Sequence, residues 1–121
     1  MSLEELKVLV RNGVEELNKQ NLAVLDEFMA VDYVDHTNQL RNREEVKQLY
    51  AKIFKNMPDF HRIVEDMIAE GDKVWVLFRI TGTDHSGKKM ESTSVTIFRM
   101  ANGKVVEGWT VPQVVSIFPQ G

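Results

Sequence analysis

The 121-residue chain contains no cysteine, so it has no disulfide, no thiolate nucleophile and no thiolate metal ligand. This suits a reducing compartment, and we expect a cytoplasmic protein. No apolar run approaches the length that spans a membrane, and the N-terminal residues 1–5 are acidic and amphipathic rather than basic and then apolar. We therefore predict no signal peptide and no membrane partner.

Basic residues are also scarce. The chain carries 15 Lys and Arg against 18 Asp and Glu, a net charge of -3, and no basic stripe, so we predict no nucleic-acid partner. The glycine fingerprints of phosphate loops and dinucleotide sites are missing, which predicts no nucleotide cofactor. Of three neighbouring Asp and His groupings, only Asp59 with His61 has a spacing that a metal site on a strand would use, so we predict no metal.

Helical periodicity fills the first half of the chain. Apolar residues recur at helical spacing over residues 2–18, which predicts an amphipathic helix. Asn21 can cap a short second helix that carries residues 22–29. Asn42, with Glu45 three residues later, has the capping-box spacing and begins a third helix, which Pro58 ends.

Strand patterns replace the helical period after Pro58. We predict strands over residues 60–70, 73–83, 90–100 and 104–118, joined by turns of which Asn102-Gly103 is the strongest hairpin signal. Three N-terminal helices packed on one face of a curved four-stranded antiparallel sheet make an α+β fold, in a single domain over residues 1–121.

The predicted sheet carries more apolar residues than one buried face requires. Residues 74–78 and 105–118 are apolar on both strand faces, whereas an antiparallel sheet with one wet face alternates apolar with polar residues. The helices of so short a chain cover one side only. We therefore predict a homodimer through the other side of the sheet.

An ordered set of motifs resembles the SnoaL-like polyketide cyclases, a family of the nuclear-transport-factor-like superfamily, which also contains ketosteroid isomerase. The motifs are Asp32 to His36, Met57 to Phe60, Glu70 to Asp72, Thr81 to Thr83 and Ile97 to Trp109. The resemblance covers most of the chain and implies a cone whose sheet and helices enclose an apolar pocket, with acid or base residues on its wall. This superfold carries isomerases, dehydratases, cyclases and non-catalytic binding domains, so the fold alone does not settle the function.

The sequence departs from that family at its expected acid and base positions. Where SnoaL-like cyclases typically carry a His before the last-strand Trp and an acidic residue four positions after it, this chain has Gly108 and Gln113. Gln113 can hydrogen-bond a carbonyl, but it cannot transfer a proton near neutral pH. The family's second-strand His is displaced by one residue to His85, and a shift of one residue turns a strand side chain to the opposite face.

His36 and the adjacent Asp35 are the predicted catalytic residues, because imidazole titrates near neutrality and a carboxylate can orient it. In the alternative interpretation Asp35 stabilises the loop and His36 closes the mouth of the pocket. Tyr33 either donates a hydrogen bond to a ligand oxygen or is a core aromatic with an exposed tip.

Three further residues are predicted to bind ligand. Arg79 lies in an apolar strand and needs either a ligand anion or an ion-pair partner such as Glu91 or Glu107. Trp109 matches a position that lines the pocket in the resembled family, and Gln113 offers an amide. Hydroxyl side chains on one strand face could line either the pocket or the dimer interface: Ser92, Ser94 and Thr96.

Two functions remain open. The first is a cofactor-free enzyme that cyclises, isomerises or dehydrates a small, largely apolar carbonyl compound, with His36 and Asp35 moving the proton and Tyr33 or Gln113 holding the oxygen. The second is a non-catalytic ligand-binding or dimerisation domain, which Gly108 and the absence of the family's acidic residue favour.

Overall fold

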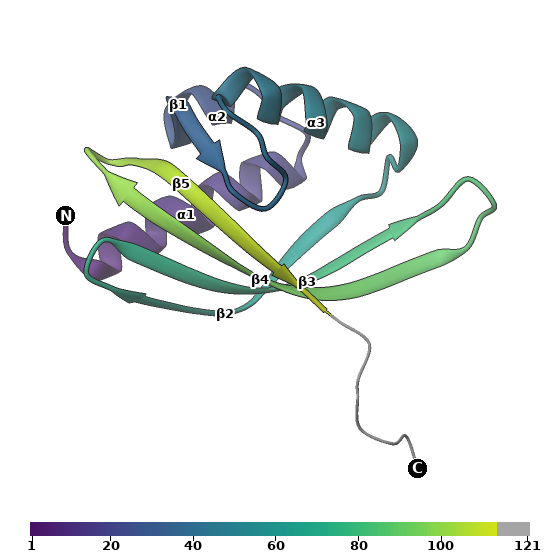
Figure 1. Ribbon diagram of the computed structural model, residues 1–121. Helices are drawn as coiled ribbons and strands as arrows, with labels where there is room; N and C mark the ends of the chain where they lie inside the picture. Colours follow the sequence, from purple (N-terminus) through teal and green to yellow (C-terminus); the bar gives the residue numbers. More distant parts are fainter. Residues whose placement is uncertain (114–121) are drawn as a thin grey trace, which may run out of the picture.

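A computed structural model describes residues 1–113, and Figure 1 shows its helices lying on the same side of one curved sheet. The helices are α1 (Leu3–Asn18), α2 (Val24–Phe28) and α3 (Arg43–Asn56). The strands are β1 (Met29–Asp35), β2 (His61–Glu70), β3 (Lys73–Thr83), β4 (Lys89–Ala101) and β5 (Lys104–Pro112). The predicted α+β plan is confirmed, but the sheet has five strands in the order β1-β5-β4-β3-β2 rather than four. The part of the predicted last strand beyond residue 113 lies outside the described residues.

Helix α3 begins where its sequence predicts. The Asn42 side chain accepts the backbone N–H of Glu45 at 2.9 Å, which satisfies one of the helix's unpaired donors. The Glu45 carboxylate accepts from the backbone N–H of Arg41 at 3.0 Å, so it caps the preceding loop. The predicted cap at Asn42 is therefore confirmed. The reciprocal hydrogen bond of a capping box would join Glu45 to the backbone N–H of Asn42, and here it joins Glu45 to that of Arg41.

The fifth strand, β1, occupies a segment that the sequence pattern assigned partly to the second helix. Helix α2 starts after Ala23 rather than at Asn21, and its last residue, Phe28, is followed directly by β1. β1 runs parallel to β5, with Asp35 opposite Gly108. The prediction of a cap at Asn21 and a longer second helix is wrong, because a partner more than seventy residues away, invisible to local periodicity, makes this segment a strand.

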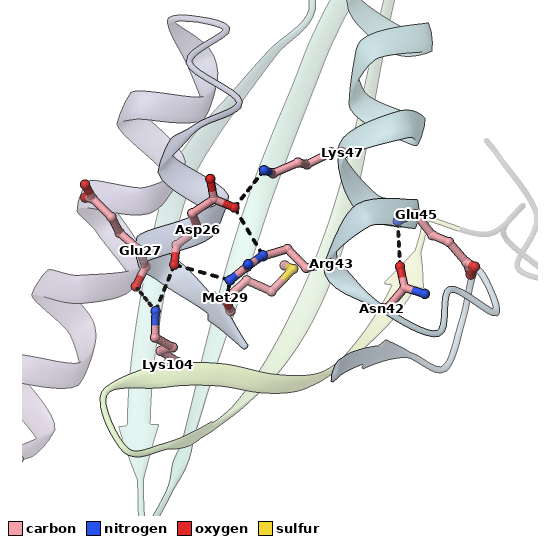
Figure 2. A network of polar contacts seen from close by, with 8 residues as sticks. All are labelled: Asp26, Glu27, Met29, Asn42, Arg43, Glu45, Lys47 and Lys104. Atoms are coloured by element: carbon pink, nitrogen blue, oxygen red, sulfur yellow. Dashed lines mark hydrogen bonds and ion pairs between the residues drawn. The ribbon is translucent and has the colours of Figure 1, made fainter. Parts of the chain in front are cut away.

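A cluster of charged side chains fixes the start of β1, as Figure 2 shows. The Asp26 carboxylate contacts Lys47 at 2.6 Å and Arg43 at 3.2 Å, and Lys104 donates to the backbone carbonyl of Asp26 at 2.8 Å. Arg43 also donates to the carbonyl of Met29 at 3.1 Å. The hydrogen bond from Lys47, assisted by the neighbouring cations, holds the pKa of Asp26 below its usual range. These contacts join α2, α3 and β5 around the first residue of β1.

The two faces of the sheet are both rich in apolar residues. On β3, Val74, Val76 and Phe78 are fully buried under the helices, while Trp75 and Leu77 point to the opposite, outer face. Strand register aligns the outer residues into two rows that cross the sheet, and together we call them the outer apolar face: Ile68, Trp75, Ile97 and Trp109 in one row, and Leu77, Val95 and Val111 in the other.

Tight hairpins connect β2 to β3 and β4 to β5, as predicted. Asn102 and Gly103 have φ angles of 53° and 75°, the left-handed backbone that a two-residue hairpin loop of this kind requires. Beyond residue 81 the hairpin of β3 and β4 projects past the other strands (Figure 1). None of the helices among residues 1–113 is long and apolar enough to cross a membrane.

Candidate ligand cavity on the inner face

A cavity of about 270 Å³ lies between the helices and the inner face of the sheet. Its wall is mainly apolar and comes from α1, α2, β1, α3 and the inner positions of the sheet. Polar side chains make up the smaller part of the wall. The polar side chains that line it are Tyr33, Asp35, Asn38, Tyr50, Arg62, Ser94, Thr96 and Thr110. A mainly apolar hollow with a few polar groups is the usual form of a small-molecule site.

Tyr33 is buried, and its hydroxyl takes the place of a side chain at position 108. A Cβ atom built on Gly108 would lie 2.1 Å from that hydroxyl, so β5 can pass it only as glycine. The resemblance leads us to expect a histidine at this position, and here the Tyr33 phenol fills that space. Burial raises the pKa of Tyr33, and the charge of Asp35 raises it further, so the phenol keeps its proton as a hydrogen-bond donor.

Asp35 is the only Asp or Glu that lines this cavity within the described residues. Its carboxylate accepts the backbone N–H groups of Thr37 and Asn38 at 3.0 and 2.9 Å and the Asn38 side-chain amide at 3.1 Å. These three bonds hold the loop after β1, as the alternative interpretation expected. They also fix the carboxylate at the cavity wall.

His36 faces the other way. Its Nε2 lies 2.6 Å from a carboxylate oxygen of Glu107, and its ring stacks on Trp109 with centroids 4.8 Å apart and planes inclined by 14°. Arg99 donates to the same carboxylate at 2.5 Å. The hydrogen bonds from His36 and Arg99 hold the pKa of Glu107 below its usual range. His36 is therefore not among the cavity-lining residues, and its nearest carboxylate partner is Glu107 rather than Asp35.

Arg62 is the polar residue of the cavity that sequence reasoning missed. It lies on β2, and Asn18 at the end of α1 grips its backbone through two hydrogen bonds, of 2.8 and 3.0 Å. Its guanidinium lies 3.9 Å from the centre of the Phe78 ring. It donates to the hydroxyls of Tyr50 at 2.8 Å and Thr96 at 3.2 Å. The alternation of Phe60, Arg62 and Val64 could have revealed a charge on an apolar strand face.

Ser94 and Thr96 on β4 lie on the inner face. Thr96 also contacts the hydroxyl of Thr110 at 3.1 Å. Ser94 lines the same cavity, and its buried hydroxyl has no hydrogen-bond partner among the described residues. The sequence left open whether these hydroxyls line the pocket or a dimer interface, and Ser94 and Thr96 line the pocket.

Three predicted ligand-binding residues lie away from the cavity. Arg79 points to the outer face of the sheet and pairs with Glu65 at 2.6 Å and with the expected partner Glu91 at 3.5 Å. Trp109 belongs to the outer apolar face, and the exposed Gln113 closes the end of the β4 pairing through its bonds with Thr93. Their predicted roles in ligand binding stay predictions, and the geometry of the cavity gives them no support.

A second, more open hollow of about 450 Å³ adjoins the cavity beneath the end of α3. It is bounded by the projecting part of the β3–β4 hairpin and shares four apolar residues with the first cavity: Leu49, Ile53, Phe60 and Ile80. A small molecule longer than the cavity can thus extend along an apolar surface. Within residues 1–113, no group of three or more His, Asp or Glu side chains is arranged to hold a metal ion.

The chain belongs to the SnoaL-like polyketide cyclase family, whose model matches residues 7–121. The resemblance stated from the sequence motifs is thereby confirmed. A comparison with curated proteins finds no match.

Solved structures agree with this assignment. AclR from Streptomyces galilaeus, described as a candidate hydroxylase, is 25% identical over 92% of this chain and 80% of its own, with a TM-score of 0.80. IdmH from Streptomyces antibioticus, described as a candidate polyketide cyclase, is 25% identical over 88% of this chain and 91% of its own, with a TM-score of 0.79. A SnoaL-like protein from Jannaschia is 26% identical over 91% and 86%, with a TM-score of 0.81.

Proposed function

We propose that the protein is a cofactor-free enzyme that removes and returns a proton beside the carbonyl group of a small, largely apolar compound. One observation carries the proposal: Asp35 and Tyr33 line the same apolar cavity. Proton removal of this kind is shared by cyclisation, isomerisation and dehydration, which are the reactions that the family resemblance implies.

Asp35 is the base in this proposal. Its carboxylate takes a proton from the carbon next to the carbonyl, and the electron pair of the broken C–H bond moves to the carbonyl oxygen as an enolate. Returning the proton to a different atom completes an isomerisation. Alternatively, the enolate carbon attacks a second carbonyl and closes a ring, and the alkoxide formed on that carbonyl's oxygen takes the proton back from Asp35. The hydrogen bonds from Thr37 and Asn38 orient the carboxylate.

Tyr33 is the donor that stabilises the enolate oxygen. Its raised pKa keeps the phenol protonated at neutral pH, so that it can donate a hydrogen bond to the developing negative charge. Gly108 leaves the space in which this hydroxyl lies. His36 was predicted to move the proton, and that role stays a prediction; its ring contacts Glu107 and Trp109, and the cavity geometry favours Asp35 as the base.

Exchange of carbon-bound protons with D₂O tests the proposal without knowledge of the natural substrate. The probe is 2-tetralone, a small bicyclic ketone, and ¹H NMR follows the loss of its signals next to the carbonyl. We expect the protein to accelerate exchange over buffer, and Asp35→Asn to reduce the acceleration by about 10²-fold or more, which is the range of a general base.

His36→Gln is the matched control, since it changes the neighbouring residue outside the cavity. It should retain the acceleration, and both variants should keep the thermal midpoint of the parent to within a few degrees. Full exchange by Asp35→Asn, together with loss of exchange by His36→Gln, would assign the proton transfer to His36. The absence of acceleration by the parent protein would remove the enzymatic proposal altogether.

A second function, dimerisation, is favoured by a different observation. The outer apolar face exposes 45% of Trp75 and 58% of Val111, and mixed-sign clusters border it: Arg79 with Glu65, and Arg99 with Glu107. In a two-fold dimer the same surface of both copies forms the interface. Charge clusters that contain both signs can therefore pair with the equivalent clusters of the second copy. We propose that a second copy of the chain covers this face.

Light scattering coupled to size-exclusion chromatography tests the homodimer. The parent protein should elute with twice the mass of one chain at micromolar concentration, and Trp75→Glu should shift it to the monomer, because a charge in a closed apolar interface is left unpaired. Glu15→Lys on the exposed surface of α1 is the control and should remain dimeric. A parent protein that is monomeric at this concentration contradicts the proposal.

A further inference from the structure

Arg62 is a cation in an apolar cavity with no carboxylate paired to it. Within residues 1–113 no Asp or Glu oxygen lies within ion-pair distance of its guanidinium, whereas Arg43, Arg79 and Arg99 each have such a partner. Its contacts are the neutral hydroxyls of Tyr50 and Thr96 and the face of Phe78. A guanidinium has five N–H donors, and these two hydroxyls leave others free.

The position of Arg62 is set by the fold rather than by a mobile side chain. The Asn18 side chain hydrogen-bonds the backbone N–H and the backbone carbonyl of Arg62, and the guanidinium packs on the face of the Phe78 ring. Removing a charge from water is costly unless an opposite charge or hydrogen bonds compensate. Arg62 is half-buried and has unused donors at the cavity, and the only carboxylate residue in the lining within residues 1–113, Asp35, forms no ion pair with it. This arrangement indicates that a closer counter-charge arrives with the ligand.

Ser94 supplies an independent observation at the same cavity. It is 5% exposed, its hydroxyl is buried, and no described residue bonds to it. Buried hydroxyls in folded proteins nearly always have a partner. Thr96, two residues along the same strand face, bonds Arg62 directly. The cavity is therefore lined by one cation without a carboxylate partner, on β2, and one unpaired hydroxyl, on β4, the two strands that flank β3.

We propose that the ligand of this cavity carries a carboxylate, which Arg62 binds through its free N–H groups, with the Ser94 hydroxyl as a further donor. The apolar wall takes the rest of the molecule, so the ligand class is a small apolar carboxylic acid. A planar guanidinium matches the two oxygens of a carboxylate better than the single oxygen of a ketone. This inference deepens the proposed function and rests on it for the reacting carbonyl, but not for binding.

Paired probes of equal shape test the charge requirement directly. Each pair is an aromatic carboxylate and its neutral amide: benzoate with benzamide, and 2-naphthoate with 2-naphthamide. Isothermal titration measures the dissociation constants, and thermal unfolding provides a second readout. We expect at least one carboxylate to bind the parent protein about tenfold or more tightly than its amide, the factor expected of a charged hydrogen bond.

Variants locate the selectivity. Arg62→Met should abolish the preference for the carboxylate, and Arg62→Lys should keep part of it, since a lysine retains charge but not the fork of donors. Arg11→Met is the matched control, because it removes an arginine from the exposed surface of α1, outside the residues that line the cavity, and it should keep the full preference.

The outcomes are separable. If the parent protein binds every carboxylate no more tightly than the matching amide, the inference is overturned. This comparison needs no variant. A carboxylate preference that survives in a folded Arg62→Met protein overturns it as well. If Arg62-dependent carboxylate binding is found while 2-tetralone exchange is not accelerated, the binding inference stands and the enzymatic proposal fails; the reverse result sustains the enzyme and removes the carboxylate.

Discussion

The inner and outer faces of the sheet use the same strands for opposite purposes. Phe78 and Leu77 are neighbours on β3, yet Phe78 is 0% exposed under the helices while Leu77 is 37% exposed on the other side. The inner face combines closely packed apolar residues with a few placed polar groups around a cavity. The outer face combines apolar rows with complete ion pairs. The difference teaches that the unpaired polar groups of the sheet lie at the cavity, whereas its outer charges are already paired with one another.

Neighbouring substitutions on β3 give the largest expected effect. Phe78→Ala should lower the free energy of unfolding by about 3 to 5 kcal/mol, because it leaves a cavity in the core and removes the support of Arg62. Leu77→Ala should cost less than about 1 kcal/mol in the monomer. Chemical denaturation followed by circular dichroism measures both values.

Protein concentration sharpens this comparison. If a second copy covers the outer face, the cost of Leu77→Ala should grow with protein concentration while the cost of Phe78→Ala relative to the parent stays fixed. Equal costs at every concentration for the two substitutions would contradict the assignment of the two faces.

The second prediction concerns the close approach of β1 and β5. Gly108→Ala should destabilise the protein by about 1 to 3 kcal/mol, because its methyl group would overlap the Tyr33 hydroxyl. In the background of Tyr33→Phe the nearest remaining ring carbon is 3.1 Å from that methyl group, so the cost should fall. A double-mutant cycle of denaturation midpoints measures the coupling. An unchanged cost in the Tyr33→Phe background would show that the phenol does not fill this space.

The smallest effect is expected from the outer-face ion pair. The pKa of Glu107 is lowered in the folded protein, so its ionised form stabilises the fold above the ordinary carboxyl pKa, and this stabilisation disappears as the pH falls through the lowered value. Glu107→Gln should therefore cost up to about 1 kcal/mol at pH 7, and this cost should shrink steadily as the pH falls below the ordinary carboxyl pKa.

Thermal unfolding from pH 7 to pH 3 measures that difference. Glu15→Gln on the exposed side of α1 is the control and should follow the parent across the range. A gap between parent and Glu107→Gln that widens on acidification would reverse the sign and contradict the role given to this carboxylate.

Local sequence signals predicted the elements that depend on local contacts. The Asn42 cap and the Asn102-Gly103 hairpin each involve residues within a few positions of one another, and the structure confirms both. Strand β1 was missed because its identity depends on parallel pairing with β5, far away along the chain. Its residues alternate only over a short stretch beside a helix.

The residues of the candidate site could be predicted from the sequence only in part. Tyr33 and Asp35 were predicted as site residues from the chemistry of their side chains, Asp35 as the partner of His36, and both line the cavity. Arg62 was missed, while Arg79 attracted attention as a charge in an apolar strand. Because β3 is apolar on both faces, its sequence could not assign Arg79 to a side of the sheet. Only the three-dimensional arrangement separates an arginine that has carboxylate partners from one that does not.

One titration tests the central claim that the ligand site is the inner cavity. Both tryptophans lie on the outer apolar face, so their indole N–H signals report on that face, while the backbone amides of Tyr33, Arg62 and Ser94 report on the cavity. In a ¹H–¹⁵N NMR titration with 2-naphthoate, we expect the cavity amides to shift and saturate while both indole signals stay in place. Shifts of the indole signals with unmoved cavity amides would contradict the account and place binding on the outer face.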